Sequence, residues 1–245
     1  MPLSRFAVFA SGTETGGGSG LRELLENSFT GVLKGIITGV ASNHENGGVK
    51  AICDEYSTPF IYRPNSEWDG QAYLDVVEKY GTDYVSLSGW IRPVFLLDPK
   101  KTFNIHPNLL KVTSSHKPIP KLGGRGMHGH HVHEAMIKAY KEGLTLYAGV
   151  SMHFVLPFDK DKMSDDKYDS GPVFFQYPVF IRDNDTADSL AQRVNKIEHG
   201  FQSYVTSLVI NNEISWDGVN PESLIVPDWY EKKWNRTIDL TEYAF

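Results

Sequence analysis

The stretch FNIHPNLL (residues 103–110) places two polar side chains in an apolar run that is interrupted by a proline. Asn104 and His106 are two residues apart, and residues with that spacing share one face of a strand. They lie at the carboxyl end of the predicted strand, where open α/β sheets bind their ligands. An amide donor beside an imidazole that titrates near neutral pH suits catalysis. A capping asparagine and a core histidine are the alternative that remains open.

Strands and helices alternate around this stretch. Apolar runs predict strands at 5–10, 33–42, 59–63, 83–90 and 102–106, and helical spacing predicts helices at 21–29, 49–56 and 71–80. Later segments predict a helix at 130–143, strands within 144–156 and 171–180, and a long helix at 186–210. The alternation predicts an α/β fold, with a mostly parallel sheet and helices on both faces. We expect one main domain over 1–210 and an irregular, aromatic-rich C-terminal extension over 211–245.

Composition narrows the class of protein. The chain has 245 residues, 40% of them hydrophobic, which suits a globular domain with a substantial core. Its single cysteine, Cys53, cannot form an internal disulfide, so a reducing compartment and a cytoplasmic location are favoured. A formal net charge of -6 argues against nonspecific nucleic-acid binding. No apolar run has the length of a membrane span, and the first residues lack a signal-peptide pattern.

A glycine-rich segment, SGTETGGGSG (11–20), follows the first predicted strand and opens a helix. Amide groups at a helix N-terminus point outward and favour an anion. The segment lacks the lysine of a P-loop. Gly18-Ser19-Gly20 is followed by Leu-Arg-Glu, without the third glycine of a dinucleotide-binding motif, and the second predicted strand ends in GVASN, without its acidic residue. We therefore favour phosphate binding here, without a nucleotide cofactor. A flexible turn is the alternative.

Four histidines crowd the segment GMHGHHVHEA (126–135), namely His128, His130, His131 and His133. Imidazole is a common zinc ligand, but no cysteine is near and the helical spacing turns His131 away from the others. A polar rim or a structural helix start is therefore favoured, and we predict no metal site.

Further acidic and imidazole groups lie later in the chain. Asp169 precedes the Ser-Gly-Pro turn, and a carboxylate near an imidazole raises its pKa and fixes its orientation. His153 and Ser151 share one strand face, and Glu198 lies in the long helix. A turn aspartate and exposed helix polarity are the alternatives, because the sequence alone does not bring Asp169 to His106.

These segments, taken in order from about Arg5 to Val209, resemble the phosphoribosylglycinamide formyltransferases. The Asn-x-His-Pro strand end followed by Asp-x-Gly-Pro is specific to formyltransferase-fold enzymes. The segments that carry the resemblance are SG…GSGL, GVASN, LSGWIRP, FNIHPNLL, GMHGHHVHEA, SMHFV, DSGPV and RVNKIEH. The resemblance implies a Rossmann-like formyltransferase fold and formyl transfer from 10-formyltetrahydrofolate to the amine of glycinamide ribonucleotide.

The resemblance also implies roles for individual residues. Asn104 would be the oxyanion donor and His106 the general acid, held protonated near pH 7 by the carboxylate of Asp169. The implied substrate-binding residues are Gly18, Ser19, Gly20, Asn195 and Glu198. The implied folate-binding residues are Ile91, Arg92, Pro93, Val94, Asn104, Tyr168 and Asp169. The implied partners are these small molecules, with no metal, nucleic acid or membrane.

The chain departs from the family pattern at several places. Gly20 replaces an asparagine, Gly70 replaces a basic residue, and both the connector 111–125 and the loop before Asp169 are longer. Whether the 211–245 extension covers a sheet edge or makes a homodimer contact stays open.

Related activities remain as alternatives. A methionyl-tRNA formyltransferase is expected to carry a basic C-terminal domain, and a formyltetrahydrofolate deformylase an N-terminal regulatory domain. A sugar-nucleotide formyltransferase is disfavoured by the phosphate loop and Glu198. A non-catalytic folate-binding protein would lack Asn104, His106 or Asp169, and all three are present.

Overall fold

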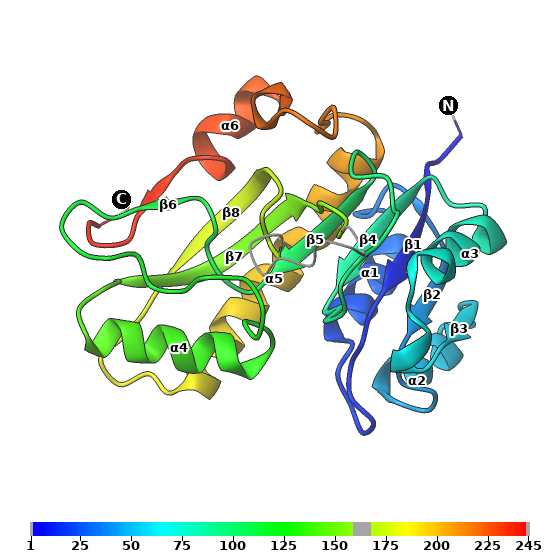
Figure 1. Cartoon of the computed structure of the whole chain (residues 1–245), viewed down its shortest axis with the longest axis horizontal. Coiled ribbons are helices and arrows are strands. Elements are labelled where there is room, and N and C mark those ends of the chain that lie inside the picture. Colours follow the sequence, from blue (N-terminus) through cyan, green and yellow to red (C-terminus); the bar gives the residue numbers. More distant parts are fainter. Residues whose placement is uncertain (1, 159–167, 244–245) are drawn as a thin grey trace.

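The centre of the molecule is a mixed β-sheet in the computed structural model, which describes residues 2–158 and 168–243 (Figure 1). Within these residues, seven strands form the sheet in the order β3-β2-β1-β4-β5-β7-β8. They are β1 (Arg5–Phe9), β2 (Ile36–Ser42), β3 (Phe60–Tyr62), β4 (Tyr84–Ser88), β5 (Thr102–His106), β7 (Tyr147–Phe154) and β8 (Val173–Phe180). The strands from β3 to β5 are parallel, whereas β7 and β8 are antiparallel to their neighbours. The predicted mostly parallel sheet is confirmed.

Helices cover both faces of this sheet, as predicted (Figure 1). The larger hydrophobic core contains side chains from four helices on one side, together with Tyr230 near the C-terminus, and the smaller core contains those of α3 on the other. The four helices are α1 (Ser19–Thr30), α2 (Gly48–Glu55), α4 (His130–Lys141) and α5 (Ala187–Ile210), and α3 is Gly70–Tyr80. No helix in the described part of the chain has both the length and the apolar character that crossing a membrane requires.

Strand β5 shows why its polar residues form a site. Phe103 and Ile105 are buried in the larger core. Because side chains alternate along a strand, Asn104 and His106 point to the opposite face. Asn104 pairs with Leu87 of β4 on one side and with His153 of β7 on the other. The strand therefore presents an amide and an imidazole beside the antiparallel edge of the sheet.

The segment after α5 is more regular than expected. It contains α6 (Asp228–Trp234), which packs against the terminal strand β8, and β9 (Ile238–Asp239), which pairs in parallel with β6 (Val112–Thr113). The expectation of a wholly irregular extension was wrong, because a two-residue strand and a seven-residue helix are too short to produce a clear periodic pattern. Aromatic packing anchors the segment, and Tyr230 is fully buried.

A capping box fixes the start of α5. The Thr186 hydroxyl accepts a hydrogen bond from the Ser189 N–H, and the Ser189 hydroxyl accepts one from the Thr186 N–H. We predict that Thr186→Ala lowers the free energy of unfolding by about 1 kcal/mol, because an orphan helix N–H loses its partner. Urea denaturation measures this change. Thr186→Ser keeps the hydroxyl and should stay within a few tenths of a kcal/mol of the parent, so an equal loss in both variants would contradict the capping role.

Candidate active site

Four polar side chains meet at the carboxyl end of β5. The Nδ1 atom of His106 lies 3.7 Å from Oδ2 of Asp169, and Nε2 of His153 lies 3.5 Å from the other carboxylate oxygen. The Asn104 amide nitrogen lies 3.2 Å from His153 Nε2. The structure thus brings Asn104, His106 and Asp169 together, as the resemblance implied. His153 was missed as a member of this group, because only the antiparallel pairing of β7 with β5 places it opposite Asn104.

The connector 111–125 closes over this group. His106 Nε2 lies 2.9 Å from the Leu122 carbonyl oxygen, which can only accept, so Nε2 carries a hydrogen and donates it. The Gly124 N–H donates to Asp169 Oδ2 at 2.8 Å. At Gly123 a Cβ atom would lie 3.0 Å from that oxygen, so the close approach favours glycine. Both nitrogens of the His106 ring therefore face oxygen atoms of the protein.

Burial sets the charge of these groups. It lowers the pKa of His106 below its ordinary value, and this effect outweighs the opposite effects of Asp169 and the Leu122 carbonyl. Burial also opposes ionisation of Asp169, but His153, His106 and the Gly124 N–H together hold the pKa of Asp169 below its usual range. Burial and the Asp169 carboxylate thus act on the pKa of His106 in opposite directions. That the carboxylate keeps His106 protonated near pH 7 stays a prediction.

The glycine-rich loop lies at the start of α1. Gly18 adopts a left-handed conformation with φ of 85° immediately before the helix, and Ser19 is its first residue. A Cβ atom at Gly20 would lie 2.5 Å from Ser88 Oγ and 3.0 Å from Gln202 Oε1. This crowding explains why the chain has glycine where the family pattern has asparagine.

Helix α5 runs beside this loop. The His199 ring contacts the Ser19 hydroxyl at 3.2 Å. The Glu198 carboxyl group approaches Gly20 on the same side, 3.6 Å from the position of an added Cβ atom. Burial raises the pKa of Glu198 from 4.5 to about 7. Asn195 lies on the same helix and is exposed. The loop and Glu198 thus face one another, with an ionisable carboxyl group beside the helix N-terminus.

The stretch 91–94 follows β4 and is held from two sides. The Tyr73 hydroxyl donates to the Pro93 carbonyl at 2.7 Å and accepts from the Trp90 indole at 3.0 Å. Ile91 is exposed, and its N–H donates to the Ser11 hydroxyl. The buried aromatic side chains of Tyr73 and Trp90 therefore fix the backbone on which this apolar side chain is presented.

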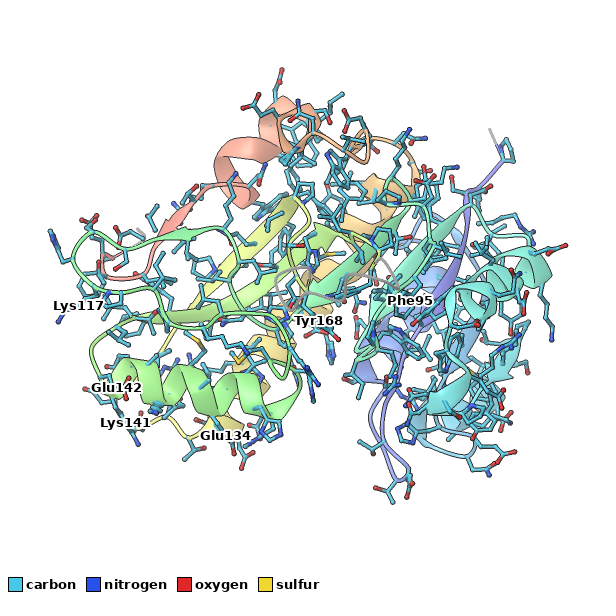
Figure 2. The ribbon with its side chains drawn as sticks, viewed as in Figure 1. Phe95, Lys117, Glu134, Lys141, Glu142 and Tyr168 are labelled. Atoms are coloured by element: carbon cyan, nitrogen blue, oxygen red, sulfur yellow. The ribbon has the colours of Figure 1, made fainter. Side chains whose placement is uncertain are left out.

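Phe158 joins this stretch to Tyr168. The Phe158 N–H donates to the Val94 carbonyl at 2.7 Å, and its ring centroid lies 4.6 Å from that of Tyr168. Figure 2 labels Tyr168 and Phe95 near the centre of the molecule. The folate-binding residues implied by the resemblance therefore share one region, although residues 165–167 before Tyr168 lie outside the described residues.

Gly70 and Arg92 mark the edge of this region. A Cβ atom at Gly70 would lie 2.6 Å from Leu96 Cδ1. Leu96 therefore occupies the space that the family's basic side chain would need. The Arg92 guanidinium donates to the Asn65 carbonyl at 3.0 Å.

A hollow of about 560 Å³ opens beside the Asp169 carboxylate. Its volume is that of a small-molecule site. It is lined by connector residues and by the chain around Asp169. Its lining includes Leu110, Leu122, Gly124, Tyr168, Asp169 and Ser170.

The histidines of 126–135 do not converge. His133 is buried, which lowers its pKa to about 4, whereas His130 is exposed and pairs with Asp188 at 2.8 Å. Among the described residues, no group of three or more His, Cys, Asp or Glu side chains is arranged to hold a metal ion.

Comparison with known proteins identifies the family to which the chain belongs. A model described as "Formyl transferase" matches residues 4–208. The chloroplastic phosphoribosylglycinamide formyltransferase of Arabidopsis thaliana is 32% identical over 227 residues, which cover 88% of this chain and 69% of the relative. The protein of the same name from Vigna unguiculata is 31% identical, and the match covers 88% of this chain and 64% of that relative.

Solved structures share the fold. A glycinamide ribonucleotide transformylase 1 from Symbiobacterium toebii superposes with a TM-score of 0.70 at 22% identity, covering 92% of this chain and 95% of that one. A formyltetrahydrofolate deformylase from Pseudomonas syringae gives a TM-score of 0.65 at 18% identity, covering 93% and 67%. The predicted formyltransferase fold is confirmed.

The raised pKa of Glu198 predicts a pH dependence of stability. The unfolded chain ionises this group near pH 4.5, whereas the folded protein keeps it protonated up to about pH 7. The contribution of this group to the free energy of unfolding should therefore fall as pH rises through this window, by up to about 3 kcal/mol. Glu198→Gln should remove that fall, measured by urea denaturation between pH 4.5 and 8.

The exposed variant Glu78→Gln is the matched control and should follow the parent. A parallel pH dependence in the parent and Glu198→Gln would contradict the burial of the carboxyl group as its cause.

Proposed function

The chain belongs to the formyl transferase family, and we propose that it transfers a formyl group from 10-formyltetrahydrofolate to the amine of glycinamide ribonucleotide in de novo purine biosynthesis. The observation that carries the proposal is the convergence of Asn104, His106 and Asp169 at the end of β5. The names of the plant relatives support this acceptor. Residues 1–210 are the proposed catalytic domain, and a cytoplasmic location stays a prediction.

The reaction needs a donor for a developing negative charge. The substrate amine attacks the formyl carbon, the new C–N bond forms, and charge builds on the formyl oxygen. The Asn104 amide and the His106 N–H stabilise this oxyanion, which is usually the largest single contribution to catalysis. Of the His106 nitrogens, Nε2 bears the hydrogen, so the formyl oxygen takes the place of the Leu122 carbonyl as its acceptor.

Proton transfer completes the exchange. The attacking amine loses a proton to the Glu198 carboxylate, and N10 of the folate gains one from His106 as the C–N10 bond breaks; exchange with solvent then restores both groups. His106 carries this proton as an imidazolium whose Nδ1–H faces the Asp169 carboxylate, 3.7 Å away. Because burial keeps the pKa of His106 low, the imidazolium is a ready acid towards N10. Asp169 thus stabilises the charged form during the step that needs it.

The acceptor substrate fits the glycine-rich loop. Backbone N–H groups at Gly18, Ser19 and Gly20 begin α1 and suit a phosphate. Glu198, with a pKa of about 7, is a base matched to the substrate amine near neutral pH. Asn195 is a further substrate contact in this proposal.

The folate would lie on the other side of His106. Ile91, Arg92, Pro93 and Val94 offer a fixed backbone with one exposed apolar side chain, and Tyr168 adds an aromatic ring joined to them through Phe158. Asp169 and Asn104 close this side next to the reacting carbon.

The deciding assay offers one donor and three acceptors. Purified protein and 10-formyltetrahydrofolate are mixed with one of three acceptors: glycinamide ribonucleotide, another amine such as a sugar-nucleotide amine, or water alone. The measurement is the rate at which 10-formyltetrahydrofolate loses its formyl group. We expect rapid loss only with glycinamide ribonucleotide. Loss in water alone would indicate a deformylase, and preference for another amine a different formyltransferase.

We predict that His106→Ala folds and binds the reduced folate but transfers the formyl group at least about a hundredfold more slowly, because an oxyanion donor and the acid are lost together. Circular dichroism, folate titration and steady-state turnover measure the three properties. Near-normal turnover would remove His106 from the mechanism.

We predict that Asp169→Asn moves the limb of the pH–rate profile that reports His106 to lower pH, because the neutral amide no longer stabilises the imidazolium. The measurement is kcat against pH in the parent and the variant. A profile that is unchanged in shape and position would reduce Asp169 to a turn residue.

A further inference from the structure

The connector 111–125 contacts both His106 and Asp169. Leu122 accepts from the His106 ring, and the Gly124 N–H donates to the Asp169 carboxylate. Asn108, two residues after β5, also donates to the Leu122 carbonyl at 3.1 Å. Apart from the two residues of β6, the connector has no strand or helix of its own. Something else must therefore hold it in place.

The C-terminal extension provides this support. Strand β9 pairs with β6, so that the Ile238 N–H donates to the Lys111 carbonyl at 3.2 Å and the Leu240 N–H donates to that of Thr113 at 3.0 Å. The Lys111 ammonium donates to the backbone carbonyl of Asn235 at 2.8 Å. The first residues of the connector are thus bonded to residues 235–240.

A buried amide ties both segments to the sheet. Gln176 of β8 is 2% exposed, and its side-chain NH₂ donates to the carbonyls of Lys111 and Arg236, each at 2.7 Å. Its carbonyl oxygen accepts from the Lys111 N–H at 3.1 Å. One side chain therefore satisfies the connector and the extension together, and the two segments cannot shift independently without leaving buried polar groups unpaired.

We propose that residues 235–240 of the extension are a positioning element for the active site. They hold the connector so that Leu122 keeps the His106 ring in place and Gly124 keeps the Asp169 carboxylate in place. In this proposal the Leu122 carbonyl keeps a hydrogen on Nε2 of His106, which then donates it in a hydrogen bond to the formyl oxygen when the substrates bind. The kinetic part rests on the proposed function, and the positioning itself does not.

The test compares two matched isoleucine-to-alanine substitutions in the extension. Ile238 of β9 and Ile214, just after α5, are 2% and 1% exposed and belong to the same hydrophobic core, but only Ile238 pairs with the connector. Replacing either with alanine removes the same atoms and should cause a similar loss of stability. Ile238→Ala is the test variant and Ile214→Ala its control.

The first readout is the His106 ring itself. Long-range ¹H–¹⁵N spectra of ¹⁵N-histidine-labelled protein report which ring nitrogen carries hydrogen, and His106→Gln assigns the signal. The groups that face this ring are Asp169, His153 and, more distantly, His133. We expect Ile238→Ala to shift the Nε2 and Nδ1 signals of His106 and its titration midpoint, and Ile214→Ala to leave them unchanged.

The second readout is turnover. We expect kcat to fall at least about tenfold in Ile238→Ala, because small misplacements of a catalytic group are costly, with little change in Ile214→Ala. Unchanged His106 signals in Ile238→Ala, equal changes in both variants, or a kcat at or above that of the parent would each overturn the proposal. Should Ile238→Ala not fold, Ile238→Val against Ile214→Val gives the same comparison.

The two proposals fail separately. If the parent does not formylate glycinamide ribonucleotide, the proposed function fails, but the His106 signals still decide whether the extension positions the ring. If the parent is active and the ring signals do not respond to Ile238→Ala, only the positioning role is lost.

Discussion

The Asp169 carboxylate carries a negative charge while only 15% of its side chain is exposed. A charge removed from water is costly unless other groups satisfy it, and here the partners come from three places in the chain. The Gly124 N–H belongs to the connector, His106 to β5 and His153 to β7. The need to satisfy one carboxylate therefore fixes how the parallel part of the sheet, its antiparallel edge and the connector lie relative to one another.

Much of this arrangement follows from local sequence. The alternation along 103–106 predicted both the strand and the shared face of Asn104 and His106, because side-chain direction in a strand depends only on position. The Thr186 cap and the apolar stripe of α5 also follow from residues that are close together in the sequence. His153 was different: its place opposite Asn104 depends on the direction in which β7 joins β5, which no local pattern encodes. The same holds for β9, whose two residues acquire a strand conformation only by pairing with β6.

Two glycines that depart from the family pattern have a common physical basis. At Gly20 the missing side chain leaves room for Ser88 and Gln202, which are bonded to each other at 3.0 Å, and at Gly70 it leaves room for Leu96. In both cases another element has filled the space of the family's side chain. A side chain introduced at either position would therefore meet a neighbouring side chain.

The pairing of β6 with β9 also affects the order in which the protein is assembled. Translation proceeds from the N-terminus, and domains begin to fold while synthesis continues. Val112 leaves the ribosome long before Ile238, its partner in the small sheet. A nascent chain can form β1 to β5 and present His106 while the segment that secures Leu122 is still inside the exit tunnel. The imidazole would gain its final surroundings only after Ile238 has emerged, so a chain shortened before this residue would carry the chemical groups without their ordered setting.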